Sequence, residues 1–185
     1  MLQPRPPPDP TGTPIEIQID HVAQLFHTLD PFPFRERDLD KEAEEFIVGW
    51  ARELPKHEPV AIIVHLPARE AESEQGREIA DALHQYFRYR ASVVTNDLRE
   101  LFRFGRYALA IGLVTLSFCI ALGQIARTTL GANEFSRILG EGLAILGWVA
   151  NWRPIEIFLY EWLPLVRRRR LFQRLARAHV TLAPR

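Results

Sequence analysis

Three short segments of the chain carry the apolar pattern of β-strands. Residues 15–20 (IEIQID) alternate apolar and polar side chains, as a strand with one buried face does. Residues 59–66 (PVAIIVHL) are apolar at nearly every position, which is typical of a central strand. Residues 178–183 alternate again, with Val180 and Leu182 on one side. The pattern therefore predicts one three-stranded sheet that the end of the chain completes.

Two helices are predicted between these strands. Residues 39–54 have apolar side chains at helical spacing and follow Asp38 and Asp40, either of which can cap the helix. The expected apolar stripe of this helix consists of Leu39, Ala43, Phe46, Ile47, Trp50 and Leu54. A longer helical pattern covers residues 77–125, where no proline occurs, so we expect one unbroken helix there.

The longest apolar run lies inside this second helix. Residues 107–126 carry no charge, and at about 1.5 Å per residue they match a hydrocarbon core of roughly 30 Å. We assign the first transmembrane helix to residues 106–126 and a polar periplasmic turn to residues 127–137. Residues 138–166 form a second apolar segment, which we interpret as a returning transmembrane helix that runs into an interfacial segment. Aromatic side chains near its end fit an interfacial belt: Trp148, Trp152, Tyr160 and Trp162.

Arginines flanking the apolar segments set the predicted orientation. Residues 99–106 contain three arginines, and residues 167–185 contain seven arginines and no acidic residue. The turn at residues 127–137 has only two. By the positive-inside rule, both termini lie in the cytoplasm.

The predicted fold is an α+β or α/β membrane protein: a small three-stranded cytoplasmic α/β module plus a two-helix transmembrane hairpin. Residues 1–14 hold six prolines and no apolar core, so we expect a disordered tail and no signal peptide. Residues 15–105 form the module, whose long helix leads into the membrane. Residues 167–185 add an Arg-rich cytoplasmic helix and the closing strand.

Composition and motifs argue against several function classes. The formal net charge is zero, so no general attraction to nucleic acid is expected. The single cysteine, Cys119, lies in the apolar run, and the six histidines do not have metal-ligand spacing. No phosphate-binding glycine loop or nucleophile elbow occurs. We therefore expect no catalytic residues, no metal, no cofactor and a non-enzymatic role.

An acidic segment, residues 35–45 (RERDLDKEAEE), lacks the spacing of a calcium-binding loop. It favours the solvated start of a helix, and a partner-binding acidic face is the alternative.

The candidate functional residues lie in the second apolar segment: Asn151, Arg153, Glu156 and Glu161. A charge at the centre of a membrane helix costs about 2.5–3.5 kcal/mol, so charges there mark candidate sites. Arg153 and Glu156 can pair because they are three residues apart. Two interpretations follow. Either the span ends near Asn151 and the rest lies in the interface, or these residues make a polar contact with another membrane subunit or line a solute path.

The run Arg167, Arg168, Arg169 and Arg170 follows this segment. We expect it to contact anionic lipid headgroups, at roughly 1 kcal/mol per residue, rather than nucleic acid.

Residues 25–51 and 147–182 together resemble conserved-hypothetical bacterial membrane proteins of similar length, with the same order of module, hairpin and arginine-rich tail. The most specific part of the resemblance is the motif W-R-P-x-E-I-F-L-Y, from Trp152 to Tyr160. The resemblance implies a bacterial inner membrane and no particular activity.

The sequence thus indicates an integral membrane protein whose partners are the lipid bilayer and a protein partner or a second copy. The leading interpretation is a membrane-anchored scaffold or accessory subunit. The alternative is an oligomeric component of a small transport or channel assembly, built through Gly112, Ser117, Gly123 and the Arg153–Glu156 pair.

Overall fold

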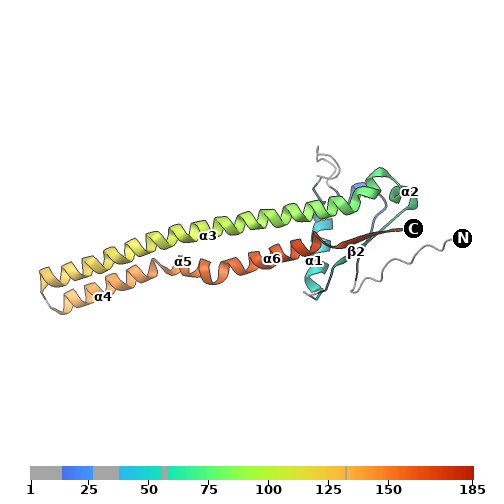
Figure 1. Cartoon of the computed structure of the whole chain (residues 1–185). Coiled ribbons are helices and arrows are strands. Elements are labelled where there is room, and N and C mark those ends of the chain that lie inside the picture. The colour runs from blue at the N-terminus through green and yellow to red at the C-terminus, as the bar shows by residue number, and fades with distance from the viewer. Residues whose placement is uncertain (1–13, 27–37, 56–57, 132) are drawn as a thin grey trace. The chain divides into compact units, whose positions relative to one another are not determined.

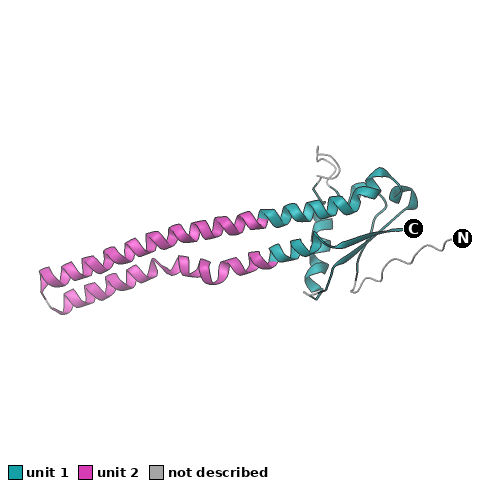
Figure 2. Ribbon diagram, viewed as in Figure 1, with its two compact units in different colours: residues 1–93, 168–185 teal, residues 94–167 magenta. Residues whose placement is uncertain are grey.

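The structure, a computed structural model, describes residues 14–26, 38–55, 58–131 and 133–185. The proline-rich tail predicted for residues 1–14 lies outside the described residues except for Pro14. The chain divides into two compact units, one of residues 1–93 and 168–185 and the other of residues 94–167 (Figure 2). We call them unit 1 and unit 2.

Unit 1 contains a parallel three-stranded sheet in the order β1-β2-β3 (Figure 1). Its strands are β1 (Ile15–Gln18), β2 (Ala61–Leu66) and β3 (His179–Pro184). The prediction of three strands with the second in the centre is confirmed, and no strand boundary differs by more than two residues. Parallel neighbours need crossover connections. Helix α1 lies in the first crossover, and all the long helices lie in the second.

The register of the sheet separates an apolar face from a mixed one. Ile62 lies between Ile15 and Val180, and equivalent pairing continues two residues further along each strand. The apolar face therefore consists of Ile15, Ile17, Ile62, Val64, Val180 and Leu182. On the other face Ile63 is flanked by Glu16 and Thr181. Strand β1 alternates buried and exposed residues, as its sequence predicts, whereas residues 180–183 of β3 are all half-buried.

Helix α1 (Lys41–Glu53) begins where predicted, because the side chain of Asp40 accepts a hydrogen bond of 2.9 Å from the Glu42 backbone N–H. Its buried residues are Ile47, Val48 and Ala51. The predicted apolar stripe was wrong for Phe46 and Trp50, whose exposed fractions are 46% and 47%. The buried face is rotated by about one residue, or 100°, from the stripe that the aromatic side chains suggested.

Helix α3 (Glu74–Leu130) is continuous, as expected for residues 77–125. Two shorter elements, the 3-10 helix η1 (Val22–Gln24) and α2 (Ala68–Ala71), complete the small elements of unit 1. The sheet's core also includes fully buried residues of α3 and of α6 (Trp162–Leu175): Ile79, Leu83, Phe87, Phe172 and Leu175.

Unit 2 is an antiparallel helix pair with a tight turn. Helix α3 ends at Leu130, Gly131 adopts a φ of 77°, and Asn133 caps α4 (Glu134–Val149) by accepting from the Ser136 N–H at 2.8 Å. The turn predicted for residues 127–137 is therefore shorter, because both helices extend into it.

The second apolar segment is helical on both sides of one break, at residues 150–151. After α4 come α5 (Trp152–Glu156) and the π-helix η3 (Ile157–Glu161), which leads into α6. Pro154 has no N–H to donate to the Ala150 carbonyl, so the α4 hydrogen-bond ladder cannot continue through it. The break therefore falls before Pro154.

Candidate functional site

The two helices of unit 2 meet along a seam of small residues. Four positions of α3, seven residues apart, are buried there: Gly105, Gly112, Cys119 and Ala126. The facing segment contributes the buried residues Ser136, Gly147, Asn151 and Pro154. A seven-residue repeat of buried positions is the pattern of a left-handed helix pair. Small side chains at these positions let the two backbones approach closely.

The space around the seam glycines shows how close this approach is. A Cβ atom on Gly112 would lie 2.6 Å from Asn151 Oδ1, and one on Gly147 would lie 2.7 Å from Leu116 Cδ1. A Cβ on Gly105 would lie 2.9 Å from Ile157 Cγ2. All three distances are shorter than packed carbon atoms tolerate. A side chain at any of these three positions would therefore force its neighbour to move.

The same contacts give the register of the helix pair. Gly123 faces Gly140, Gly112 faces Asn151, and Gly105 faces Phe158. In this antiparallel pair, each step forward along α3 matches one step back along the facing segment. Tyr107, where the charge-free run begins, therefore lies level with Glu156. Arg153 is thus only three residues, or about 5 Å, inside the end of the apolar run.

The structure brings together three of the predicted site residues. Arg153 Nη1 lies 3.3 Å from Glu156 Oε2, and Arg153 also forms an ion pair with Glu161. Trp152 Nε1 donates to Glu156 Oε1 at 2.9 Å. Eight residues of an α-helix turn by about 80° beyond two full turns, and the wider π-turn brings these two side chains closer into line. Both carboxylates lie toward the charged end of the segment. The interfacial interpretation of this cluster stays a prediction.

Asn151, the fourth predicted residue, lies apart from that cluster in the seam. Its side chain is buried, and Nδ2 donates to the Gly112 carbonyl at 3.1 Å and to the Gly147 carbonyl at 2.9 Å. Because both partners are carbonyl acceptors, the NH₂ group of the Asn151 side chain, and not its oxygen, points toward them. Oδ1 is buried and has no hydrogen-bond partner among the described residues. A single asparagine in an apolar seam specifies helix register, and we assign that role to Asn151.

Outside the seam, unit 2 exposes large apolar side chains on both helices. On α3 they include Ile111, Leu113, Val114, Phe118 and Ile125, and on the facing segment they include Ile138, Ile145, Leu146, Trp148 and Val149. By length and composition α3 could cross a membrane, and only 17% of its apolar window is buried. Among the described helices no other meets that criterion. The helix pair thus has small residues inside and large apolar residues outside.

The arginine run divides between the two units. Arg167 belongs to unit 2, whereas Arg168 lies over the Phe172 ring of unit 1, 5.4 Å from its centroid. Arg167 and Arg170 are exposed, and Arg169 Nε is buried with no hydrogen-bond partner among the described residues. Contact with lipid headgroups stays a prediction for this run.

Sequence reasoning missed a partly buried polar cluster in unit 1. The Tyr86 hydroxyl donates to Glu44 Oε2 at 2.7 Å, and Arg90 Nη2 lies 2.7 Å from Glu44 Oε1. Burial, and then the hydrogen bond to Glu44, raise the pKa of Tyr86 above its usual value. Tyr86 and Arg90 are one helical turn apart, but nothing local in the sequence identifies Glu44, on another helix, as their partner.

Among the described residues, no three His, Cys, Asp or Glu side chains are grouped to hold a metal ion. No family model matches the chain, and neither a curated protein nor a solved structure is similar to it. The resemblance to bacterial membrane proteins therefore stays a prediction.

Proposed function

We propose that unit 2 is a two-helix transmembrane hairpin of the bacterial inner membrane, with both termini and the α/β module on the cytoplasmic side. In this proposal the chain is a membrane-anchored scaffold or accessory subunit without enzymatic activity, and it presents its module to a protein partner.

The observation that carries this proposal is the distribution of side chains in the helix pair. A helix pair in water places large apolar residues in its seam and polar residues outside. Unit 2 does the reverse at most positions: its seam holds glycine, serine and cysteine together with Asn151, Pro154 and Ile157, and most of its Ile, Leu, Val, Phe and Trp side chains lie outside. Lipid removes the driving force for apolar burial between helices and favours small residues at their contact.

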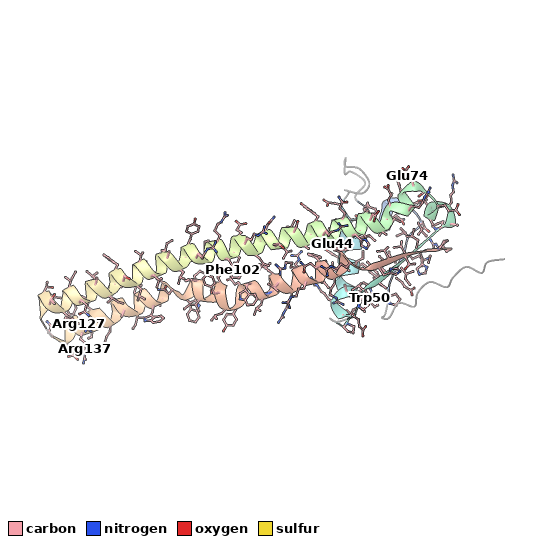
Figure 3. All side chains as sticks on the ribbon, in the orientation of Figure 1. Glu44, Trp50, Glu74, Phe102, Arg127 and Arg137 are labelled. Atoms are coloured by element: carbon pink, nitrogen blue, oxygen red, sulfur yellow. The ribbon has the colours of Figure 1, made fainter. Side chains whose placement is uncertain are left out.

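The charged residues support the same arrangement. The end of unit 2 where α3 meets α4 carries Arg127 and Arg137 (Figure 3), whereas the opposite end carries Arg99, Arg103 and Arg106 as well as Arg153. In the proposed bilayer Arg153 lies close to the cytoplasmic boundary, where its long side chain reaches the two glutamates and the headgroup region.

The oligomeric transport or channel alternative has less support. Gly112 and Gly123, which would have mediated helix contacts between copies, pack against Asn151 and Gly140 of the same chain. Of the three small residues considered, Ser117 is the exposed one. Arg153 has two carboxylate partners within its own chain.

Purification of the full-length chain in a mild detergent separates these functions. The scaffold proposal predicts that a different protein copurifies in fixed stoichiometry, and that the purified chain conducts no ions in lipid vesicles. A homo-oligomer that conducts ions would contradict it and establish the alternative.

A further inference from the structure

The outer face of α1 carries a pair of aromatic residues that are not buried in the core. Phe46 and Trp50 are about half exposed, and their ring centroids lie 6.1 Å apart at an interplanar angle of 55°. In the described part of unit 1 the only other exposed large hydrophobic residue is Tyr89. A module that otherwise buries its apolar side chains thus leaves two of its largest together at the surface, which is typical of an interaction site.

The α1 backbone beside this pair is accessible, so a partner molecule can approach it closely. Gly49 lies between the two aromatic residues on the exposed side of α1, and a Cβ built there meets no atom within 4 Å. Trp50 is visible on α1 in Figure 3. Aromatic anchors dominate the energetics of protein interfaces, and a glycine next to them provides a shallow floor for a partner side chain.

Charges on α1 specify what kind of partner fits. Glu42 and Glu53 bracket the aromatic pair and lie within about 80° of it around the helix axis. Both are exposed, and among the described residues neither has an ion-pair partner. The cations Lys41 and Arg52 lie outside the strip of helix surface that holds the two aromatic residues and these two glutamates. Lys41 pairs with Glu45 at 3.8 Å.

The remaining acid of this region, Glu44, faces away from the stripe. It binds Tyr86 and Arg90 in the interior of unit 1. The outer stripe is therefore apolar at its centre and negative at both ends. Such a surface repels an anionic membrane and attracts a positively charged protein segment.

We infer that the stripe Glu42–Phe46–Gly49–Trp50–Glu53 is the docking surface for a basic amphipathic helix of a partner protein. The partner places apolar side chains over the aromatic pair and a Lys or Arg near each glutamate, about 16 Å apart along the helix. This inference names the type of partner that the proposed scaffold function requires and rests on that function.

The test uses a photo-crosslinking amino acid, benzoylphenylalanine, in place of Trp50 in the full-length chain within its native cells. We expect a light-dependent product with one other protein, and mass spectrometry should map it to a helix with basic residues flanking an apolar stripe. The double substitution Glu42→Lys and Glu53→Lys should lower the yield at least tenfold. Arg52→Glu, which changes the charge outside the stripe, should leave the yield unchanged.

A crosslinker at Asp81, an exposed residue of unit 1 outside the stripe, is the matched control and should not give this product. Products only with a second copy, only with lipid, or none at all would overturn the inference, as would a product insensitive to the charge reversal. Membrane fractionation of the same cells tests the proposed function separately. A chain found in the soluble fraction refutes membrane anchoring, whereas the crosslink still reports on α1.

Discussion

Asn151 and Gly112 hold the seam of unit 2 in one register. The Asn151 amide donates to the carbonyls of Gly112 and Gly147, one on each helix of the pair. A Cβ atom at residue 112 would lie 2.6 Å from its Oδ1. The two residues therefore depend on each other: the asparagine needs the accessible glycine backbone, and a larger residue at position 112 would have to displace the asparagine.

A pair of glycine substitutions tests this contact. Gly142→Ala should stabilise the helix pair by about 1 kcal/mol, because alanine is the better helix former and nothing lies within 4 Å of that position. Gly112→Ala gains the same propensity but places a methyl group against Asn151, so we expect a net loss of about 1–3 kcal/mol, as for other overpacked contacts. Unfolding of the purified protein in mixed detergent micelles measures both.

The double variant Gly112→Ala with Asn151→Ala should recover part of this loss, since the nearest clashing atom is removed. Equal effects of the substitutions at residues 112 and 142 would show that the seam is not packed as described.

Tyr86 gives unit 1 a pH dependence of known sign. Its pKa is raised in the folded state, so the folded protein keeps the phenolic proton at pH values where the unfolded chain loses it. The stabilisation is complete below about pH 10, the unfolded pKa, and is lost as the pH rises above it. Tyr86→Phe should lower the free energy of unfolding by about 1 kcal/mol at pH 8 and flatten its decline above pH 10. Urea unfolding of the full-length chain from pH 8 to 11 measures both, and an unchanged alkaline decline in the variant would contradict the assignment.

At the scale of elements, the sequence predicted the strands and helices that are determined by the order of apolar and polar residues and by the positions of proline. The alternation in residues 15–20 and 178–183 specified two strands, and the lack of proline specified the length of α3. One of the two interpretations of the second apolar segment ended the span near Asn151, and the structure has a break there. The π-helix was not predicted, because no local pattern in the sequence marks it. The parallel pairing of the sheet likewise comes from tertiary contacts and leaves no local pattern.

The two faces of strand β3 should respond differently to a charged substitution. Val180 pairs with Ile62 on the apolar face, whereas Thr181 pairs with Ile63 on the mixed face. Val180→Asp would set a charge against the core, so we expect a loss of about 2–4 kcal/mol and a protease-sensitive module. Thr181→Asp should cost less than half as much.

Limited proteolysis and thermal unfolding of the two variants compare them directly, and membrane insertion should be unaffected in both. Equal tolerance of aspartate at the two positions would mean that β3 does not contribute its apolar face to the core.

At the scale of the whole molecule, the sequence predicted the apolar run but not the partners of its small residues. The oligomeric alternative used Gly112 and Gly123 to join copies of the chain, and in the structure both glycines pack against the second helix of the same chain. Seven-residue spacing from Gly105 to Ala126 was the available signal, since every member is small. The outer face of α1 could not be read from the sequence, because Phe46 and Trp50 have the spacing of core residues.

Cysteine accessibility tests the central claim, that unit 2 is a transmembrane hairpin with both termini in the cytoplasm. In a Cys119→Ala background, single cysteines replace Glu134, at the start of α4, and Glu72, in unit 1; both positions are exposed. We predict that Glu134→Cys reacts with a membrane-impermeant maleimide in intact cells and that Glu72→Cys reacts only after the cells are permeabilised. Labelling of both in intact cells, of neither, or of Glu72→Cys alone would contradict the account.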